Sequence, residues 1–232
     1  MRRVFAEIDR QTENLRSHEA FLMISDLSSA EAVQTLKGWG PLFVHLTMTF
    51  RDINLMYNLY PDPANDLERA INAHAAVDAT HWEMLVTDLN ALGVSDDVKS
   101  YKDAMTILWS QPGRPIRDYI YWVLHRAQRC GSSPLLKLTA MESCEATVKT
   151  FLTHTRPVRA LFESATGAKL NYFGEGHIDS EVDNAINLSI FQEVELDPQT
   201  LTLALWIVNA HFDDFKVFIG HLSGHPPEAQ QS

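Results

Sequence analysis

The segment INAHAAVDATHW, residues 71–82, places His74, Asp78 and His81 at spacings of four and three residues. On a helix with 3.6 residues per turn, these three side chains share one face. That face continues in both directions with apolar residues, which predicts burial: Leu67, Ile71, Leu85 and Leu89. A buried polar group without a partner costs roughly 2–7 kcal/mol. We therefore expect these side chains either to satisfy one another in a core network or to bind a metal ion.

A second stripe of the same kind lies about a hundred residues later, in LNYFGEGHIDSEVDNAINLSIF, residues 170–191. It combines His177, Glu181 and Asn184 with apolar residues at helical spacing: Leu170, Phe173, Leu188 and Phe191. Two buried carboxylates repel each other unless a cation or a proton lies between them. The recurrence of imidazole and carboxylate on a second stripe therefore favours a metal site.

A third helical segment, LLKLTAMESCEATVKTFL, residues 135–152, contains two more carboxylates, Glu142 and Glu145. Helical periodicity slightly favours Glu145 on the apolar stripe but does not choose between the two. An exposed position, which is usual for a helix glutamate, is open for either of them.

The combined set consists of imidazoles and carboxylates from three helices, without a thiolate. This donor set suits iron or manganese, and it is large enough for two ions bridged by a glutamate. Magnesium and calcium prefer more oxygen ligands, and a closed zinc site needs fewer ligands and commonly uses cysteine. Iron with an open position beside an apolar cavity would activate dioxygen, and Phe43, Met48, Phe50, Met56 and Tyr57 are candidate wall residues.

The elements that must position these residues are all helical, because β-branched runs bounded by turns hardly occur. Gly38, Gly40 and Pro41 predict a bend or break in the second helix. Asp62 and Pro63 predict the start of the third helix, and Gly93 its end. The helices are expected at 2–24, 29–59, 62–93, 97–109, 115–130, 134–166, 170–192 and 198–222. We predict one all-α domain of about seven to eight helices over residues 1–222 and a loose tail over 223–232.

The net charge of −11, from 19 basic and 30 acidic residues, argues against nucleic acid or an anionic membrane as the main partner. The polar AEIDRQTEN after the basic start does not resemble a signal peptide, and no run approaches the roughly 18 apolar residues of a membrane span. Cys130 and Cys144 have neither disulfide-framework nor zinc-site spacing. We expect a cytoplasmic protein with a small-molecule substrate, and a homodimer is an open expectation.

NAHAAVDATHW, followed by LTAMESCE and then YFGEGHIDSE, resembles the haem-oxygenase-like non-haem diiron oxidases and oxygenases. These share a fold with the TenA thiamine-salvage proteins and the coenzyme-PQQ synthase. The resemblance covers residues 30–220 in helix order, and its specific part is confined to the three motifs. It implies a single-domain haem-oxygenase-like bundle that binds Fe(II)/Fe(III) as two ions, with manganese as an alternative metal.

The resemblance also implies which residues bind the metal. Asp78 and His81 match the family's carboxylate-x2-His motif, and the family's middle glutamate matches Glu142, against the slight periodicity preference for Glu145. The full implied set is His74, Asp78, His81, Glu142, His177 and Glu181. One departure is that Asn184 stands where the family has a final histidine. Since an amide is a weak iron ligand, the second ion would be labile, differently coordinated or absent, unless His74 compensates.

By resemblance, the protein is an oxidoreductase that uses O2 and acts on a small amine, an amino-acid-derived compound or a fatty acid. Electrons would come from the substrate or an external donor. Arg51, Arg126 and Arg159 are candidates to pair with a substrate carboxylate.

Three alternatives remain open. A TenA-like hydrolase or metal-free ligand-binding protein would have the same fold, with a cysteine nucleophile in the hydrolase. Haem oxygenase itself would need an axial histidine near the amino terminus, where His18 is the candidate. A non-catalytic helical protein would use the stripes as ion-pair networks. A ferritin-like bundle is disfavoured because it needs two Glu-x2-His motifs.

Overall fold

The computed structural model describes residues 1–24, 27–183 and 191–224, with the side chains of Asp97 and residues 181–183 outside the description. The regular secondary structure of the described residues is entirely helical, with no strand among them, which confirms the predicted fold class. No helix among them combines the length and apolar character that a membrane crossing requires. The predicted tail lies outside the description from residue 225 onward.

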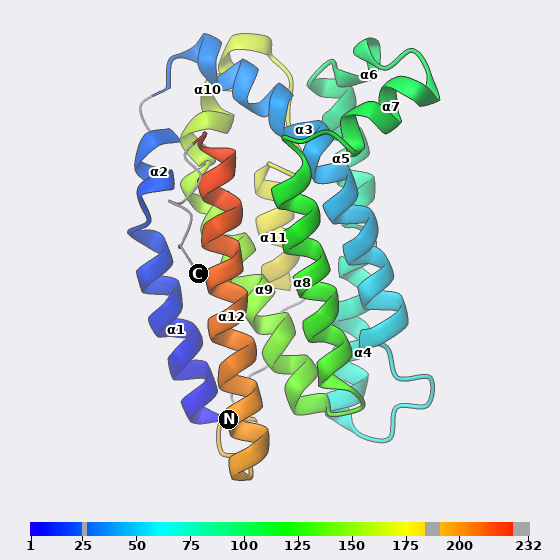
Figure 1. Cartoon of the computed structure of the whole chain (residues 1–232), viewed down its shortest axis with the longest axis vertical. Helices are drawn as coiled ribbons and strands as arrows, with labels where there is room; N and C mark the ends of the chain where they lie inside the picture. Colours follow the sequence, from blue (N-terminus) through cyan, green and yellow to red (C-terminus); the bar gives the residue numbers. More distant parts are fainter. Residues whose placement is uncertain (25–26, 184–190, 225–232) are drawn as a thin grey trace.

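The main helices run side by side along the long axis of the molecule, and α9 and α8 lie near its centre (Figure 1). The elements are α1 (Arg2–Arg16), α2 (Glu19–Ile24), α3 (Ser29–Ile53), the π-helical turn η1 (Asn54–Asn58), α4 (Asp66–Asp78), α5 (His81–Ala91), α6 (Val94–Asp97), α7 (Tyr101–Leu108), α8 (Arg114–Cys130), α9 (Pro134–His154), α10 (Arg156–Thr166), α11 (Glu175–Asp183) and α12 (Pro198–Leu222).

Two predicted helices have nearly the predicted bounds because local signals define their ends. Asp197 accepts hydrogen bonds from the backbone N–H groups of Gln199 and Thr200, and Pro198 occupies the first turn of α12. Such caps satisfy N–H groups that have no partner inside the helix. Helix α8 likewise starts with a proline in its first turn and ends before Gly131.

Several other predicted helices are divided in the structure. The predicted helix 62–93 is wrong as one continuous element: it begins at Asp66, capped by Asn65, and is interrupted at Ala79 and Thr80. Residues 2–24 and 134–166 each form two helices, and the predicted helix 97–109 is shortened to α7, with the short α6 before it. The interruptions reflect turns with hydrogen bonds that periodicity alone does not reveal.

Of the bend or break predicted around Gly38, Gly40 and Pro41, a break does not occur, because α3 is continuous from Ser29 to Ile53. The neighbouring Gly40 faces α5, where an added Cβ atom would approach Leu92 Cδ1 to 2.9 Å. This close packing holds α3 against the segment around α5 and favours a continuous helix, although Pro41 has no N–H group to donate. The helical pattern instead changes at η1, where the Asn58 amide donates to Asn54 Oδ1 at 2.7 Å.

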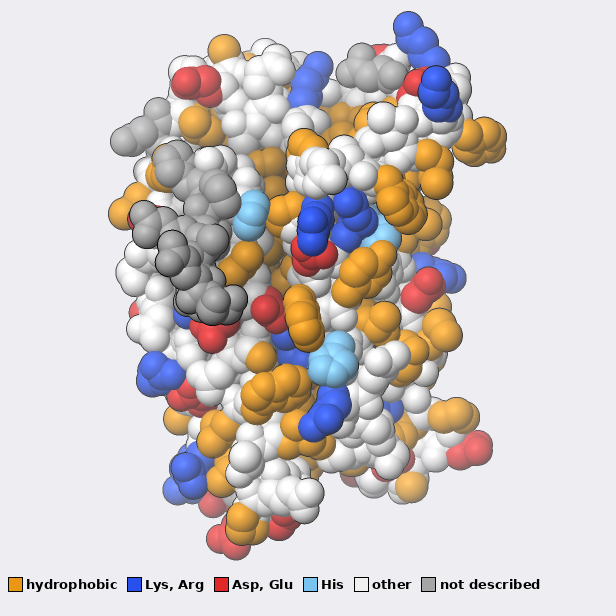
Figure 2. All heavy atoms as spheres, in the orientation of Figure 1, with side chains coloured by type: hydrophobic (Ala, Val, Ile, Leu, Met, Phe, Trp, Pro, Cys, Tyr) orange, Lys and Arg blue, Asp and Glu red, His pale blue; other side chains and the backbone are white. Residues whose placement is uncertain are grey.

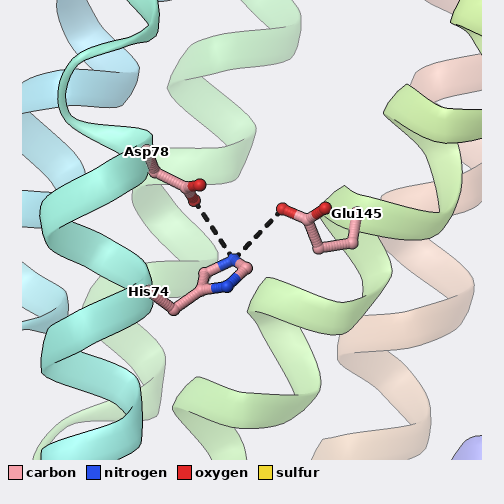
Figure 3. Close-up of side chains that lie close together, drawn as sticks. All are labelled: His74, Asp78 and Glu145. Atoms are coloured by element: carbon pink, nitrogen blue, oxygen red, sulfur yellow. Dashed lines mark hydrogen bonds and ion pairs between the residues drawn. The ribbon is translucent and has the colours of Figure 1, made fainter. Parts of the chain in front are cut away.

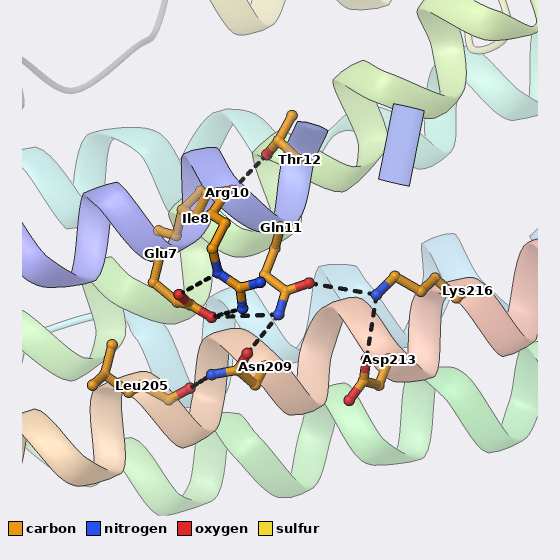
Figure 4. Close-up of polar contacts among 9 residues, drawn as sticks. All are labelled: Glu7, Ile8, Arg10, Gln11, Thr12, Leu205, Asn209, Asp213 and Lys216. Carbon is orange, nitrogen blue, oxygen red and sulfur yellow. Dashed lines mark hydrogen bonds and ion pairs between the residues drawn. The ribbon is translucent and has the colours of Figure 1, made fainter. Parts of the chain in front are cut away.

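Helix α1 packs along α12 through a polar contact inside an apolar interface (Figure 4). Gln11 is buried and donates through Nε2 to Asn209 Oδ1 at 2.5 Å, and Lys216 Nζ donates to Gln11 Oε1 at 3.4 Å. Because each end of the Gln11 amide has a partner, its burial is not a large penalty. This contact joins the first and last helices across about 200 residues of sequence.

The face formed by α7, α8 and α12 exposes hydrophobic side chains between charged ones (Figure 2). The large exposed residues on these elements are Tyr101, Met105, Tyr121, Trp122, Trp206 and Val217. The apolar core lies behind this face, and His74, Asp78, His81 and His177 are buried.

Candidate metal centre

The side chain of His74 lies between two carboxylates (Figure 3). Its Nε2 atom is 3.5 Å from Asp78 Oδ2, one turn along α4, and 3.1 Å from Glu145 Oε1 on α9. His74 and Asp78 are each 3% exposed, and Glu145 is half-buried. One N–H group cannot donate well to two oxygens, so convergence of two carboxylates on this nitrogen indicates a place for a cation.

The donor atoms are close enough for one ion. One ligand atom from each of His74, Asp78 and Glu145 lies within 4.8 Å of the others. Ligands that bind one ion at about 2.1 Å lie at most about 4.2 Å apart. A shift of a few tenths of an ångström would therefore complete the coordination, and the described donor set fits a transition metal.

The structure brings Glu145, rather than Glu142, against His74, which agrees with helical periodicity and differs from the residue implied by resemblance. Glu142 lies one turn away on α9. Burial raises the pKa of its carboxyl group to about 7, although the nearby His74 opposes part of this rise. The two positions were hard to separate because α9 is a central helix with buried residues on all sides. Glu142 as a ligand stays a prediction.

His81 and His177 contact each other, with ring centroids 4.4 Å apart, and both line the same cavity as Glu145. His81 remains buried despite the interruption between α4 and α5. At that interruption the Thr80 hydroxyl donates to the Val77 carbonyl at 2.7 Å, and the Thr80 N–H donates to the same oxygen at 2.8 Å. This local turn starts a new helix with His81 as its first residue.

The orientation of His177 follows from a hydrogen bond to the backbone. Its Nδ1 lies 2.8 Å from the Tyr172 carbonyl oxygen, so Nδ1 carries the proton and donates. The lone pair of the neutral ring is then on Nε2, the arrangement usual for metal-binding histidines.

The loop that carries Tyr172 is held by Asp88 of α5, which is fully buried. Its carboxylate accepts from the N–H of Asn171 at 2.6 Å and of Phe173 at 2.9 Å. Burial raises the pKa of Asp88, and the backbone donors oppose that shift. Asp88 was not among the predicted site residues, and its position on the stripe side of the segment DLNAL was the available signal.

Two positions singled out in the sequence fall outside the description: the predicted ligand Glu181, and Asn184, which departs from the family motif. Glu181 belongs to α11, but its side chain is outside the described residues, and Asn184 lies outside them entirely. The structure thus brings together His74, Asp78 and Glu145, pairs His81 with His177, and leaves the positions of Glu181 and Asn184 as predictions.

An apolar cavity adjoins these residues. His81, Glu145 and His177 line it together with Phe43, Phe50 and Val123. Glu145 therefore belongs both to the carboxylate–imidazole cluster and to the wall of the cavity. Of the wall residues expected from the sequence, Phe43 and Phe50 are confirmed, whereas Met48 and Met56 are exposed and Tyr57 does not line this cavity.

A second buried polar cluster, unpredicted from the sequence, lies between α8, α9 and α12. His211 Nε2 lies 3.0 Å from Thr147 Oγ1 and 3.4 Å from the Tyr119 hydroxyl, and its Nδ1 lies 4.0 Å from Cys144 Sγ. Burial, with a contribution from Arg126, holds the pKa of His211 well below its ordinary value, so the ring is neutral. In the sequence, His211 is a single histidine within the apolar run that forms α12, and a single histidine does not predict a polar cluster.

The three arginines that are candidates to pair with a substrate carboxylate differ in burial and in their partners. Arg51 is exposed and pairs with Asp52, and Arg159 is buried against Glu175 and the Phe173 carbonyl. Arg126 is buried, donates to Asp214, and lines a small cavity.

The hydrolase alternative depends on Cys130 or Cys144, and the haem-oxygenase alternative depends on His18. Burial raises the pKa of the Cys144 thiol, and it raises the pKa of Cys130 to about 12. Both shifts disfavour the thiolate that a cysteine nucleophile requires. His18 Nδ1 accepts from the Ala20 N–H at the start of α2.

The metal-centre geometry stands without support from relatives: the sequence matches no protein-family model, and comparison with curated proteins gives no match.

Proposed function

We propose that the protein is an oxygen-activating non-haem iron oxidoreductase that binds two iron ions, with manganese as the alternative metal. Its substrate would be a small amine, an amino-acid-derived compound or a fatty acid. Electrons would come from the substrate or from an external donor.

The observation that carries the proposal is the convergence of Asp78 and Glu145 on His74, with Glu145 also lining the apolar cavity. Imidazole and carboxylate donors of this kind suit iron and manganese. His81 and His177, which line the same cavity, supply further imidazoles. The five residues His74, Asp78, His81, Glu145 and His177 would hold the metal, and Glu142 and Glu181 remain candidates.

Iron, when bound, supplies one-electron redox chemistry and a binding position for dioxygen. The protein would contribute placement and exclusion of water. The apolar wall around Phe43 and Phe50 would hold the substrate beside the ligands, and the Tyr172 carbonyl would fix the His177 ring. A dry cavity also protects reactive species from side reactions with solvent.

Anaerobic addition of Fe(II), followed by metal analysis and exposure to O2, tests the proposal. We expect close to two bound ions per chain and a transient absorbance after O2. His81→Gln and His177→Gln should lower the bound iron, while His125→Gln, a change on the exposed side of α8, should not. Failure of the wild-type protein to retain iron above the level of a control protein would contradict the proposal.

A second candidate is a metal-independent ligand-binding protein, for which the apolar cavity is the favourable observation. In that case His74 would be protonated and would satisfy the two carboxylates as an ion-pair network. Metal content after purification separates the two functions, because a core network retains no stoichiometric metal.

A further inference from the structure

A small cavity lies between η1, α8, α9 and α12, next to the larger cavity of the candidate metal centre. Most of its wall is apolar, and its polar groups come from Arg126, Asn58 and His211. Phe50, Val123 and Cys144 line both cavities, so the two spaces adjoin along the same side chains.

Arg126 presents an unsatisfied donor at this cavity. Its side chain is 3% exposed, and Nη1 donates to Asp214 of α12. Nη2 is buried and has no hydrogen-bond partner among the described residues. A buried donor without an acceptor is expensive, and more so on a charged group. The cavity is therefore suited to an occupant with an oxygen acceptor.

The charges around Arg126 indicate which kind of acceptor fits. Asp214 already balances the guanidinium charge through direct contact. Burial keeps His211 neutral, and the thiol of Cys130 is protonated for the same reason. Lys137 donates its ammonium N–H to the Asn58 carbonyl at 3.2 Å; burial lowers the pKa of this ammonium, and Glu68 opposes part of that shift. A carboxylate placed here would thus add a buried charge without a cation of its own.

We propose that this cavity binds an uncharged carbonyl oxygen, such as that of an amide or ketone, at one end of an otherwise apolar ligand. The apolar remainder extends along Phe50 and Val123 toward His81 and Glu145. The inference rests on the proposed function and narrows its substrate class to compounds with an uncharged carbonyl group, which disfavours a free fatty acid. It replaces the expectation that Arg126 pairs with a substrate carboxylate.

The test uses metal-free full-length protein and isothermal titration calorimetry at pH 7.5 with hexanamide and hexanoate, which share a chain length. We expect hexanamide to bind at least 10-fold more tightly than hexanoate. Arg126→Met should weaken hexanamide binding at least 10-fold.

Asp214→Asn is the sharper variant, because asparagine keeps an oxygen acceptor for Arg126 and removes the balancing charge. It should tighten hexanoate binding at least 10-fold. Asp213→Asn is the matched control: the same change one residue earlier, on a 69% exposed side chain that pairs with Lys216. It should leave both affinities within about twofold.

Equal or tighter binding of hexanoate to the wild-type protein would overturn the proposal. So would an unchanged preference in Asp214→Asn, or binding of neither probe, which would mean that the cavity holds only water. Failure of the proposed function is separate: iron retention would be absent while the hexanamide preference persisted.

Discussion

Two buried polar clusters meet different faces of α9 and satisfy their charges differently. On one face, Asp78 and Glu145 converge on His74, so acidic groups gather around a single imidazole. On the other, Arg126 pairs with Asp214, and a neutral His211 contacts Thr147. Burial is similar in both, and the balance of charge differs. The first cluster therefore favours a cation from outside, and the second is nearly balanced by the chain itself.

The largest effect is expected from removing a carboxylate of the first cluster. Glu145→Gln should weaken the affinity for iron at least 100-fold. The Glu145 Oε1 atom lies 3.1 Å from His74 Nε2, and the side chain lines the cavity. Glu142→Gln is the matched control on the same helix and should have a smaller effect. Iron content after anaerobic loading measures both. The reverse ranking would show that Glu142 is the ligand, as the family resemblance implies.

Breaking the balanced pair of the second cluster should destabilise the fold without removing metal. Asp214→Ala leaves the Arg126 charge buried, and we expect a loss of about 3 kcal/mol in the free energy of unfolding. Asp66→Ala removes a carboxylate whose pair with Arg69 is exposed, and should change stability by less than about 0.5 kcal/mol. Urea denaturation provides the measurement, and equal losses would contradict the distinction between the two pairs.

Asp88→Asn should affect the first cluster indirectly. An asparagine amide cannot accept from both the Asn171 and Phe173 N–H groups without turning its NH2 group toward a donor. We expect a loss of about 2 kcal/mol in stability. Faster hydrogen exchange at residues 171–173 should accompany it, since this loop orients His177. Unchanged exchange there would show that Asp88 does not hold the loop.

The second cluster should make stability depend on pH. Since folding lowers the pKa of His211, only the unfolded chain takes up this proton below its ordinary value of about 6.5. Its contribution to stability is therefore complete above about pH 6.5 and is lost as pH falls, by up to about 1.4 kcal/mol per pH unit. Denaturation of wild type and His211→Gln between pH 7.5 and 5.5 measures this slope. An equally steep slope in the variant would exclude His211 as the source.

Local signals account for much of the fold. Helix α12 was predicted with its observed bounds, because Asp197 and Pro198 act within one turn of the helix start. The positive φ of 71° at Gly93 similarly agrees with its prediction as a helix stop. Interruptions such as the one at Thr80 were missed, since one side-chain hydrogen bond interrupts the helix without altering the hydrophobic pattern.

The sequence by itself determined that the protein is all helical, and that His74, Asp78, His81 and His177 belong to buried faces. Helical spacing and the cost of burying polar groups are properties of each segment alone. The tertiary structure decided that Glu145 contacts His74, that Asp88 holds the loop before His177, and that Arg126 faces a cavity. Those outcomes depend on how helices far apart in sequence pack. In a central helix such as α9, residues on all sides are buried, so periodicity ranks its faces only weakly.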